Sequence, residues 1–146
     1  MAKFDIKNKD IFEFWQSWKT ANVKYDIICP GNTLSFPDPI CKKIAVLIDS
    51  TLIENHSSDK SYDFQGNIEM KSSSKNRGAT PFHKSQSNCS RVIFFRIINN
   101  KIEYYNITDA TALSKINTAA QNGENIILMN YIEKYNIGYT EINIKK

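Results

Sequence analysis

The stretch from Arg91 to Ile98 constrains the fold of this chain more than any other. It reads RVIFFRII, a run of β-branched and aromatic residues that is typical of a strand. Asn99 and Asn100 can turn the chain, and the residues from Lys101 to Ile107 alternate as a partner strand would. The sequence therefore predicts a β-hairpin over residues 91–107.

Before and after this hairpin, apolar residues recur at helical spacing, which predicts four helices. The four expected helices run from Asp10 to Asn22, from Ser35 or Asp38 to Leu52, from Thr108 or Asp109 to Gln121, and from Ile126 to Tyr135. Residues 23–36 contain Pro30 and Gly31 and are expected to form a connection, whereas Tyr139 to Ile144 alternates as an edge strand. We predict an α/β (α+β) fold with a small central mixed, mostly antiparallel β-sheet flanked by helices.

The composition bounds the kind of protein. A chain of 146 residues with 41% hydrophobic residues has enough material for one domain, residues 1–146. Its longest apolar run, Ile44 to Ile48, is too short to span a membrane, and the polar start does not match a signal peptide. We expect a cytoplasmic protein without a membrane partner. The three cysteines lack metal-site spacing and are expected to be free thiols.

The positive charge of the chain is concentrated in one third of it. Between Glu69 and Glu103 there is no acidic residue, and seven lysines and arginines occupy the interval. The rest of the chain has twelve basic and fifteen acidic residues. A segment that lies along phosphates excludes carboxylates because they repel the nucleic acid backbone, so the pattern favours a polyanion partner.

One group of residues at the start of this interval could perform chemistry. Tyr62 to Gln65 and Ile68 to Ser72 flank Gly66-Asn67 and are expected to form a second β-hairpin. Glu69 and Lys71 would then share a face of one strand, with Asp63 opposite Met70. At one point, two carboxylates and a carbonyl can hold Mg²⁺, and an ammonium can orient a water molecule for phosphodiester hydrolysis.

A structural explanation of the same residues stays open. An acid two residues before a lysine is common, and Asp5-Ile6-Lys7 has the same pattern. Such residues often form a cross-strand salt bridge on a solvated hairpin.

The motif resembles that of the PD-(D/E)xK, restriction-endonuclease-like nucleases. Asp63 with Glu69-Met70-Lys71 matches their metal-and-lysine motif, although Tyr62 replaces the proline. Asp63-Phe64 followed by Ile68 to Ser72 is most similar to the MutH mismatch-repair nicking endonucleases and related type II restriction enzymes. These relatives also use an acid on a preceding helix. Asp49, fourteen residues before Asp63, occupies the matching place, and Glu54 competes with it.

The resemblance implies a Mg²⁺-dependent, sequence-specific endonuclease of type II restriction character. It would be a bacterial enzyme that acts on double-stranded DNA, often as a homodimer. Asp63, Glu69 and the Met70 carbonyl would hold Mg²⁺, Lys71 would position the attacking water, and Asp49 would hold a metal-bound water or a second ion.

The long polar loop after Ser72 is the expected DNA contact. Its basic residues would contact phosphates and its amides would read bases. The candidates are Lys75, Arg77, Lys84 and Arg91 for phosphate, Asn76, Gln86 and Asn88 for adenine, and Arg77 for guanine. Two alternatives remain open: a non-catalytic DNA-binding module, and a structure-selective nuclease such as a junction resolvase.

Overall fold

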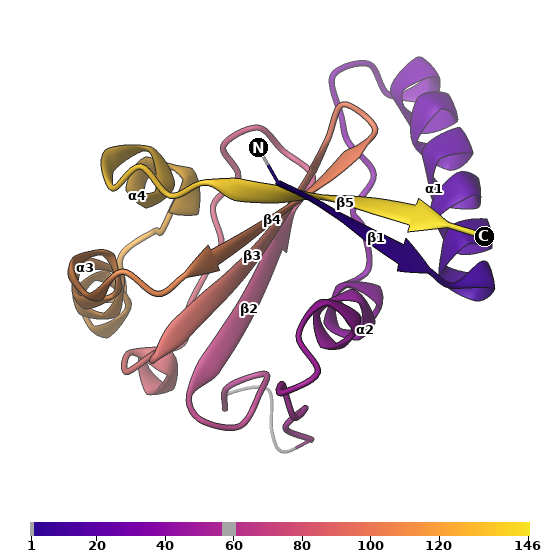
Figure 1. The fold of residues 1–146 in the computed structure, drawn as a ribbon. Helices are drawn as coiled ribbons and strands as arrows, with labels where there is room; N and C mark the ends of the chain where they lie inside the picture. The colour runs from indigo at the N-terminus through magenta and orange to yellow at the C-terminus, as the bar shows by residue number, and fades with distance from the viewer. Residues whose placement is uncertain (1, 57–60) are drawn as a thin grey trace.

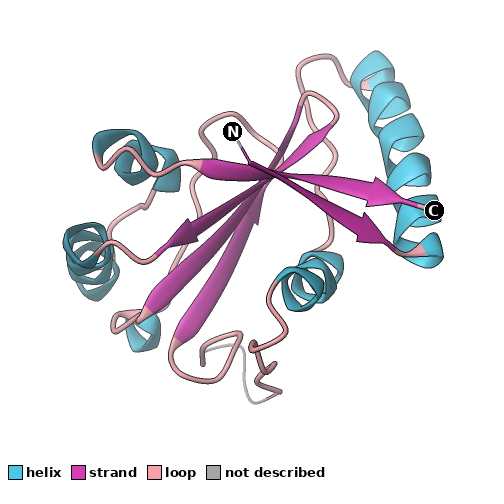
Figure 2. Ribbon diagram, viewed as in Figure 1, coloured by secondary structure: helices cyan, strands magenta, loops and turns pink. Residues whose placement is uncertain are grey.

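A five-stranded mixed sheet with helices on both faces forms the body of the protein (Figures 1 and 2). The computed structural model describes residues 2–56 and 61–146. The strands are β1 (Ala2–Lys7), β2 (Ile68–Ser73), β3 (Arg91–Ile98), β4 (Lys101–Ile107) and β5 (Tyr139–Lys145), and the helices are α1 (Lys9–Ile28), α2 (Asp38–Ile48), α3 (Ala110–Gln121) and α4 (Leu128–Lys134). The spatial order is β1-β5-β4-β3-β2. The predicted mixed α and β architecture is confirmed.

The strand pairs at the centre of the sheet are antiparallel, and those at its two edges are parallel. The neighbours β3, β4 and β5 run antiparallel, whereas β1 is parallel to β5 and β2 is parallel to β3. The predicted hairpin over β3 and β4 is confirmed, with Val92 opposite Ile107 and Ile98 opposite Lys101. Asn99 and Asn100 both have positive φ, a conformation that asparagine tolerates better than most residues.

Each face of the sheet has its own hydrophobic core, because successive residues of a strand point to opposite faces. Ile93 and Phe95 of β3 pack on the side of α1 and α2, and Val92 and Phe94 pack on the side of α3 and α4. On the first side, Trp15 and Trp18 are stacked with their ring centroids 5.5 Å apart, and both are buried. These two tryptophans of α1 therefore belong to the core.

The N-terminal region differs from the sequence prediction in three ways. The first helix is capped by Asn8, whose side chain accepts a hydrogen bond from the Ile11 amide at 3.0 Å, rather than by Asp10. It also continues to Ile28, six residues beyond the predicted end, because the first helix-breaking residues are Pro30 and Gly31. The helix is preceded by the strand β1, which the sequence analysis did not predict.

The other differences concern strand partners. The strand β5 was predicted at an edge, but it lies between β1 and β4 because the N-terminal strand covers it. The segment predicted as the first strand of the second hairpin forms only isolated bridges through Phe64, to Ile68 and to Glu54. The strand β2 instead pairs with β3. In the part of the chain that the structure describes, no helix has the length and apolar character needed to cross a membrane.

Candidate active site at the free edge of β2

Among the residues that the structure describes, one side of β2 has no strand as a partner, and Asp63 lies against that side. The Met70 amide donates a hydrogen bond to Asp63 Oδ2 at 2.9 Å. Gly66 and Asn67, both with positive φ, return the chain so that this contact can form. Because the N–H and C=O groups of one strand residue point to the same side, the Met70 carbonyl also points off the edge.

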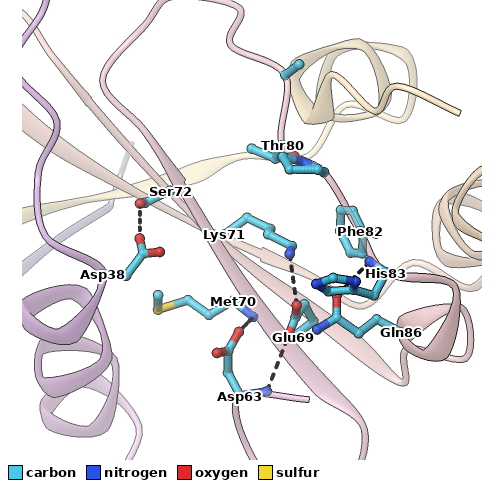
Figure 3. A pocket seen from close by; sticks show the side chains of 12 residues that line it. Asp38, Asp63, Glu69, Met70, Lys71, Ser72, Thr80, Phe82, His83 and Gln86 are labelled. Carbon is cyan, nitrogen blue, oxygen red and sulfur yellow. Dashed lines mark hydrogen bonds and ion pairs between the residues drawn. The ribbon is translucent and has the colours of Figure 1, made fainter. Parts of the chain in front are cut away.

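The carboxylates of Asp63 and Glu69 meet at this edge. The Asp63 amide donates to Glu69 Oε1 at 3.1 Å (Figure 3). The two carboxyl groups also lie close enough for each to affect the pKa of the other. The separation of six residues is bridged by the tight turn between them. The sequence prediction that Asp63 and Glu69 come together beside Met70 is therefore met by the geometry.

Each carboxylate has a lysine partner. Lys71 Nζ lies 2.9 Å from Glu69 Oε2, as the shared face of β2 predicted. Lys42 Nζ, from α2, lies 2.9 Å from Asp63 Oδ1. The Lys71 ammonium also lies over the ring of Phe82, 4.6 Å from its centroid, in a cation–π contact. The site thus holds two acids and two ammonium groups.

The two acids titrate differently because their surroundings differ. The side chain of Glu69 is only 2% exposed. Burial, followed by the neighbouring Asp63 carboxylate, raises the pKa of Glu69 to about 7, although Lys71 opposes the shift. Burial also acts to raise the pKa of Asp63, but the interaction with Glu69, the Met70 amide and Lys42 outweigh it and hold that pKa below its usual range. Asp63 is therefore the more strongly ionised acid of the pair.

A cavity of about 440 Å³ opens beside the pair. Glu69, Lys71 and Asp63 line one wall, and the segment from Ala79 to His83 lines the opposite wall (Figure 3). Asp38, at the start of α2, completes the lining and accepts a hydrogen bond from the Ser72 hydroxyl. The cavity brings side chains from α2, β2 and the following loop to one place.

The donor set of this site suits a hard divalent cation. Asp63 and Glu69 contribute carboxylate oxygens, and the Met70 carbonyl points toward the same edge. Within residues 2–56 and 61–146, no group of three or more histidine, cysteine or acidic side chains is placed to hold a metal. Mg²⁺ is commonly bound through one or two carboxylates while it keeps several waters, so two acids and a carbonyl fit it.

The two acids proposed from the sequence as helix acids, Asp49 and Glu54, both follow the end of α2 and pair with other basic residues. Asp49 follows the last residue of α2 and forms a 2.8 Å ion pair with Arg91. It also accepts hydrogen bonds from the backbone and side chain of Thr51. Its competitor Glu54 pairs with Lys43 at 3.0 Å. The acid of α2 that lines the cavity is Asp38, so the structure does not bring Asp49 to the Asp63 and Glu69 pair.

Several predicted DNA contacts are engaged within the protein. Arg77 pairs with Glu133 at 2.8 Å, and Arg91 with Asp49. Gln86 is buried, and its side chain donates to the Ser61 carbonyl and accepts from the His83 amide. An interior amide with these bonds is not presented to a base edge.

The remaining predicted contacts lie at the surface. Lys75, Asn76, Lys84 and Asn88 are exposed, as is the ion-paired Arg77. The side chain of Asn76 accepts a hydrogen bond from Arg96 at 2.8 Å, and the backbone of Asn88 bonds to Tyr62 and Asn67. The two exposed lysines, Lys75 and Lys84, are the members of the set best placed to meet a phosphate.

The sequence prediction missed Asp38 and Lys42. They are four residues apart on α2, so they lie on one side of that helix, which faces the edge of β2. The i, i+4 spacing of an acid and a lysine was the available signal, but it is also the ordinary pattern of an exposed helix.

Comparison of the chain with family models, with curated proteins and with solved structures finds no significant match.

Proposed function

We propose that this protein is a Mg²⁺-dependent DNA endonuclease of the PD-(D/E)xK type, with type II restriction character. The observation that carries the proposal is the meeting of Asp63, Glu69 and Lys71 beside a cavity at the free edge of β2. A restriction-endonuclease-like fold is part of the proposal, and a mixed sheet with helices on both faces supports it.

Each residue of the site has a proposed role that follows from its chemistry. Asp63 and Glu69, with the Met70 carbonyl, would hold Mg²⁺. When bound, this ion neutralises charge on a phosphate and activates water. Lys71 would donate a hydrogen bond to the attacking water and hold it in line with the phosphorus atom. Phe82 keeps the Lys71 ammonium over its ring and so limits where that ammonium can go.

A non-catalytic DNA-binding module is the second candidate, and one observation favours it. Both carboxylates already have an ammonium partner at 2.9 Å, which is what a structural salt-bridge network requires. The burial of Glu69 argues in the other direction, because a buried acid is a costly way to build a surface salt bridge. The two candidates differ in whether Mg²⁺ produces cleavage.

A plasmid assay tests the proposal. Supercoiled DNA incubated with the protein and Mg²⁺ should give nicked or linear products, and EDTA or Ca²⁺ should suppress them. Discrete fragments from a linear substrate would indicate sequence specificity, whereas preference for a four-way junction would indicate a resolvase. Binding without any Mg²⁺-dependent cleavage would leave the DNA-binding module. Light scattering with and without DNA tests the proposed homodimer.

A further inference from the structure

The two lysines of the site are held with different strength. Lys71 is 16% exposed, its partner Glu69 is 2% exposed, and Phe82 packs against its ammonium. Lys42 is 29% exposed and its partner Asp63 is 21% exposed. Lys42 also reaches the site from a helix, whereas Lys71 and Glu69 belong to the same strand. Of the two ammonium groups, that of Lys42 is the easier to displace.

The hydrogen bonds of Asp63 show what such a displacement would achieve. Its Oδ2 accepts from the Met70 amide, a backbone group that is fixed by the strand. Its Oδ1 accepts from the Lys42 ammonium. A cation that approached Asp63 through Oδ1 would meet the Lys42 charge at close range, and two positive charges on one carboxylate oxygen repel each other strongly in a partly buried place.

We propose that Lys42 is the resident counter-ion of Asp63 and that it competes with a divalent cation for this carboxylate. This inference rests on the proposed function for the identity of the cation site, and it assigns Lys42 as a positioning residue that sets the cation affinity. In the absence of the cation, Lys42 keeps the Asp63 charge compensated and the carboxylate in place. Occupation of the site then requires the ammonium to leave.

The chain offers a matched control on the same helix. Lys43 is the next residue, carries the same charge, and forms an ion pair with Glu54 at 3.0 Å. It is 65% exposed, and its partner is not part of the Asp63 and Glu69 pair. Lys43→Met therefore removes one positive charge and one ion pair from the neighbourhood without removing the counter-ion of Asp63.

Titration with Mn²⁺ alone, without DNA, tests the inference by electron paramagnetic resonance. Lys42→Met should bind Mn²⁺ about five- to tenfold more tightly than the natural protein, because the competing charge is gone. Lys42→Arg should keep the original affinity, and Lys43→Met should change it less than about twofold, as expected for a screened surface charge. Lys42→Gln gives a second neutral variant if Lys42→Met folds poorly.

Thermal unfolding supplies an independent readout. Loss of Lys42 leaves Asp63 partly buried without its counter-ion, so Lys42→Met should have a lower Tm in EDTA and a larger increase of Tm on addition of Mn²⁺. A merely structural lysine would lower the Tm equally in both conditions.

The outcomes separate this inference from the proposed function. Equal Mn²⁺ affinity in the natural protein and Lys42→Met, or no Mn²⁺ binding by either, overturns the role of Lys42. Tighter binding by Lys42→Met together with no cleavage of any DNA substrate supports the counter-ion role and overturns the nuclease proposal.

Discussion

The edge of β2 and the basic loop that follows it were both predicted to be functional from the sequence, but the structure places their residues differently with respect to those predictions. At the edge, the Glu69 carboxylate contacts the Asp63 amide and the Lys71 ammonium, so the three residues come together as their spacing predicted. In the loop, Arg77 and Gln86 are engaged with other parts of the chain. The first prediction depended on short-range geometry along nine residues. The second depended on a count of charges, which says nothing about the partners that distant segments supply.

The largest effect should come from the edge. Asp63→Asn and Lys71→Met should each lower Mg²⁺-dependent cleavage by about a thousandfold, because the first weakens the cation site and the second removes the group that orients water. Plasmid cleavage under single-turnover conditions is the measurement. Lys43→Met, the exposed lysine of α2, should cleave at the original rate. Full activity of either edge variant would remove these assignments.

The next effect tests whether an arginine of the basic interval is structural. Arg96 forms a 2.8 Å ion pair with Glu103, which is buried and also accepts from the Tyr105 hydroxyl. Arg96→Met would leave Glu103 without its counter-ion and should lower the free energy of unfolding by about 3 kcal/mol. Urea unfolding followed by fluorescence measures the change. Arg77→Met, which breaks an exposed pair, should leave the urea midpoint almost unchanged.

The raised pKa of Glu69 predicts how stability depends on pH. The pKa is about 7 in the folded protein and near 4.5 in the unfolded chain, so the folded state binds more protons between these values. The free energy of unfolding should therefore fall as pH rises from about 5 to 7, by up to about 3 kcal/mol.

Glu69→Gln is the control for this pH dependence and should flatten the slope. The lowered pKa of Asp63 acts in another window, because its stabilisation is lost only as pH falls below about 4. Urea unfolding at several pH values provides the test. A natural protein whose stability increases from pH 5 to 7 would contradict a raised pKa for the buried Glu69.

The smallest effects should come from the exposed part of the loop. Lys75→Ala and Lys84→Ala should each weaken DNA binding by a few-fold and reduce the salt dependence of the logarithm of affinity by about 0.9, which is the release of one counter-ion. Fluorescence anisotropy at several salt concentrations, with Ca²⁺ in place of Mg²⁺, measures both quantities. An unchanged salt slope in the double variant would show that DNA does not run along this loop.

The sequence was informative where a feature is encoded locally. The hairpin of β3 and β4 follows from two alternating strands around Asn99-Asn100, and α3 is capped by Asp109, one of its two predicted caps. Turn residues and caps act over a few residues, so their physical effect is visible in the chain itself.

The partners of the strands and the helix acid at the cavity were harder to predict from the sequence. The N-terminal strand β1 pairs with β5 from the other end of the chain, and β2 pairs in parallel with β3 across the long loop. Parallel pairing of this kind leaves no turn signal in the sequence. The helix acid at the cavity is Asp38 rather than Asp49, because the direction in which α2 packs decides which end of it meets β2.

The sequence by itself determined the close approach of Asp63, Glu69 and Lys71, because alternation along a strand and a tight turn fix which side chains share a face. Tertiary structure alone decided that Lys42 and Asp38 join them, and that Arg77, Gln86 and Arg91 are turned to partners within the fold. Those contacts depend on the packing of helices and loops against the sheet, and the energies that set this packing are summed over residues far apart in the chain.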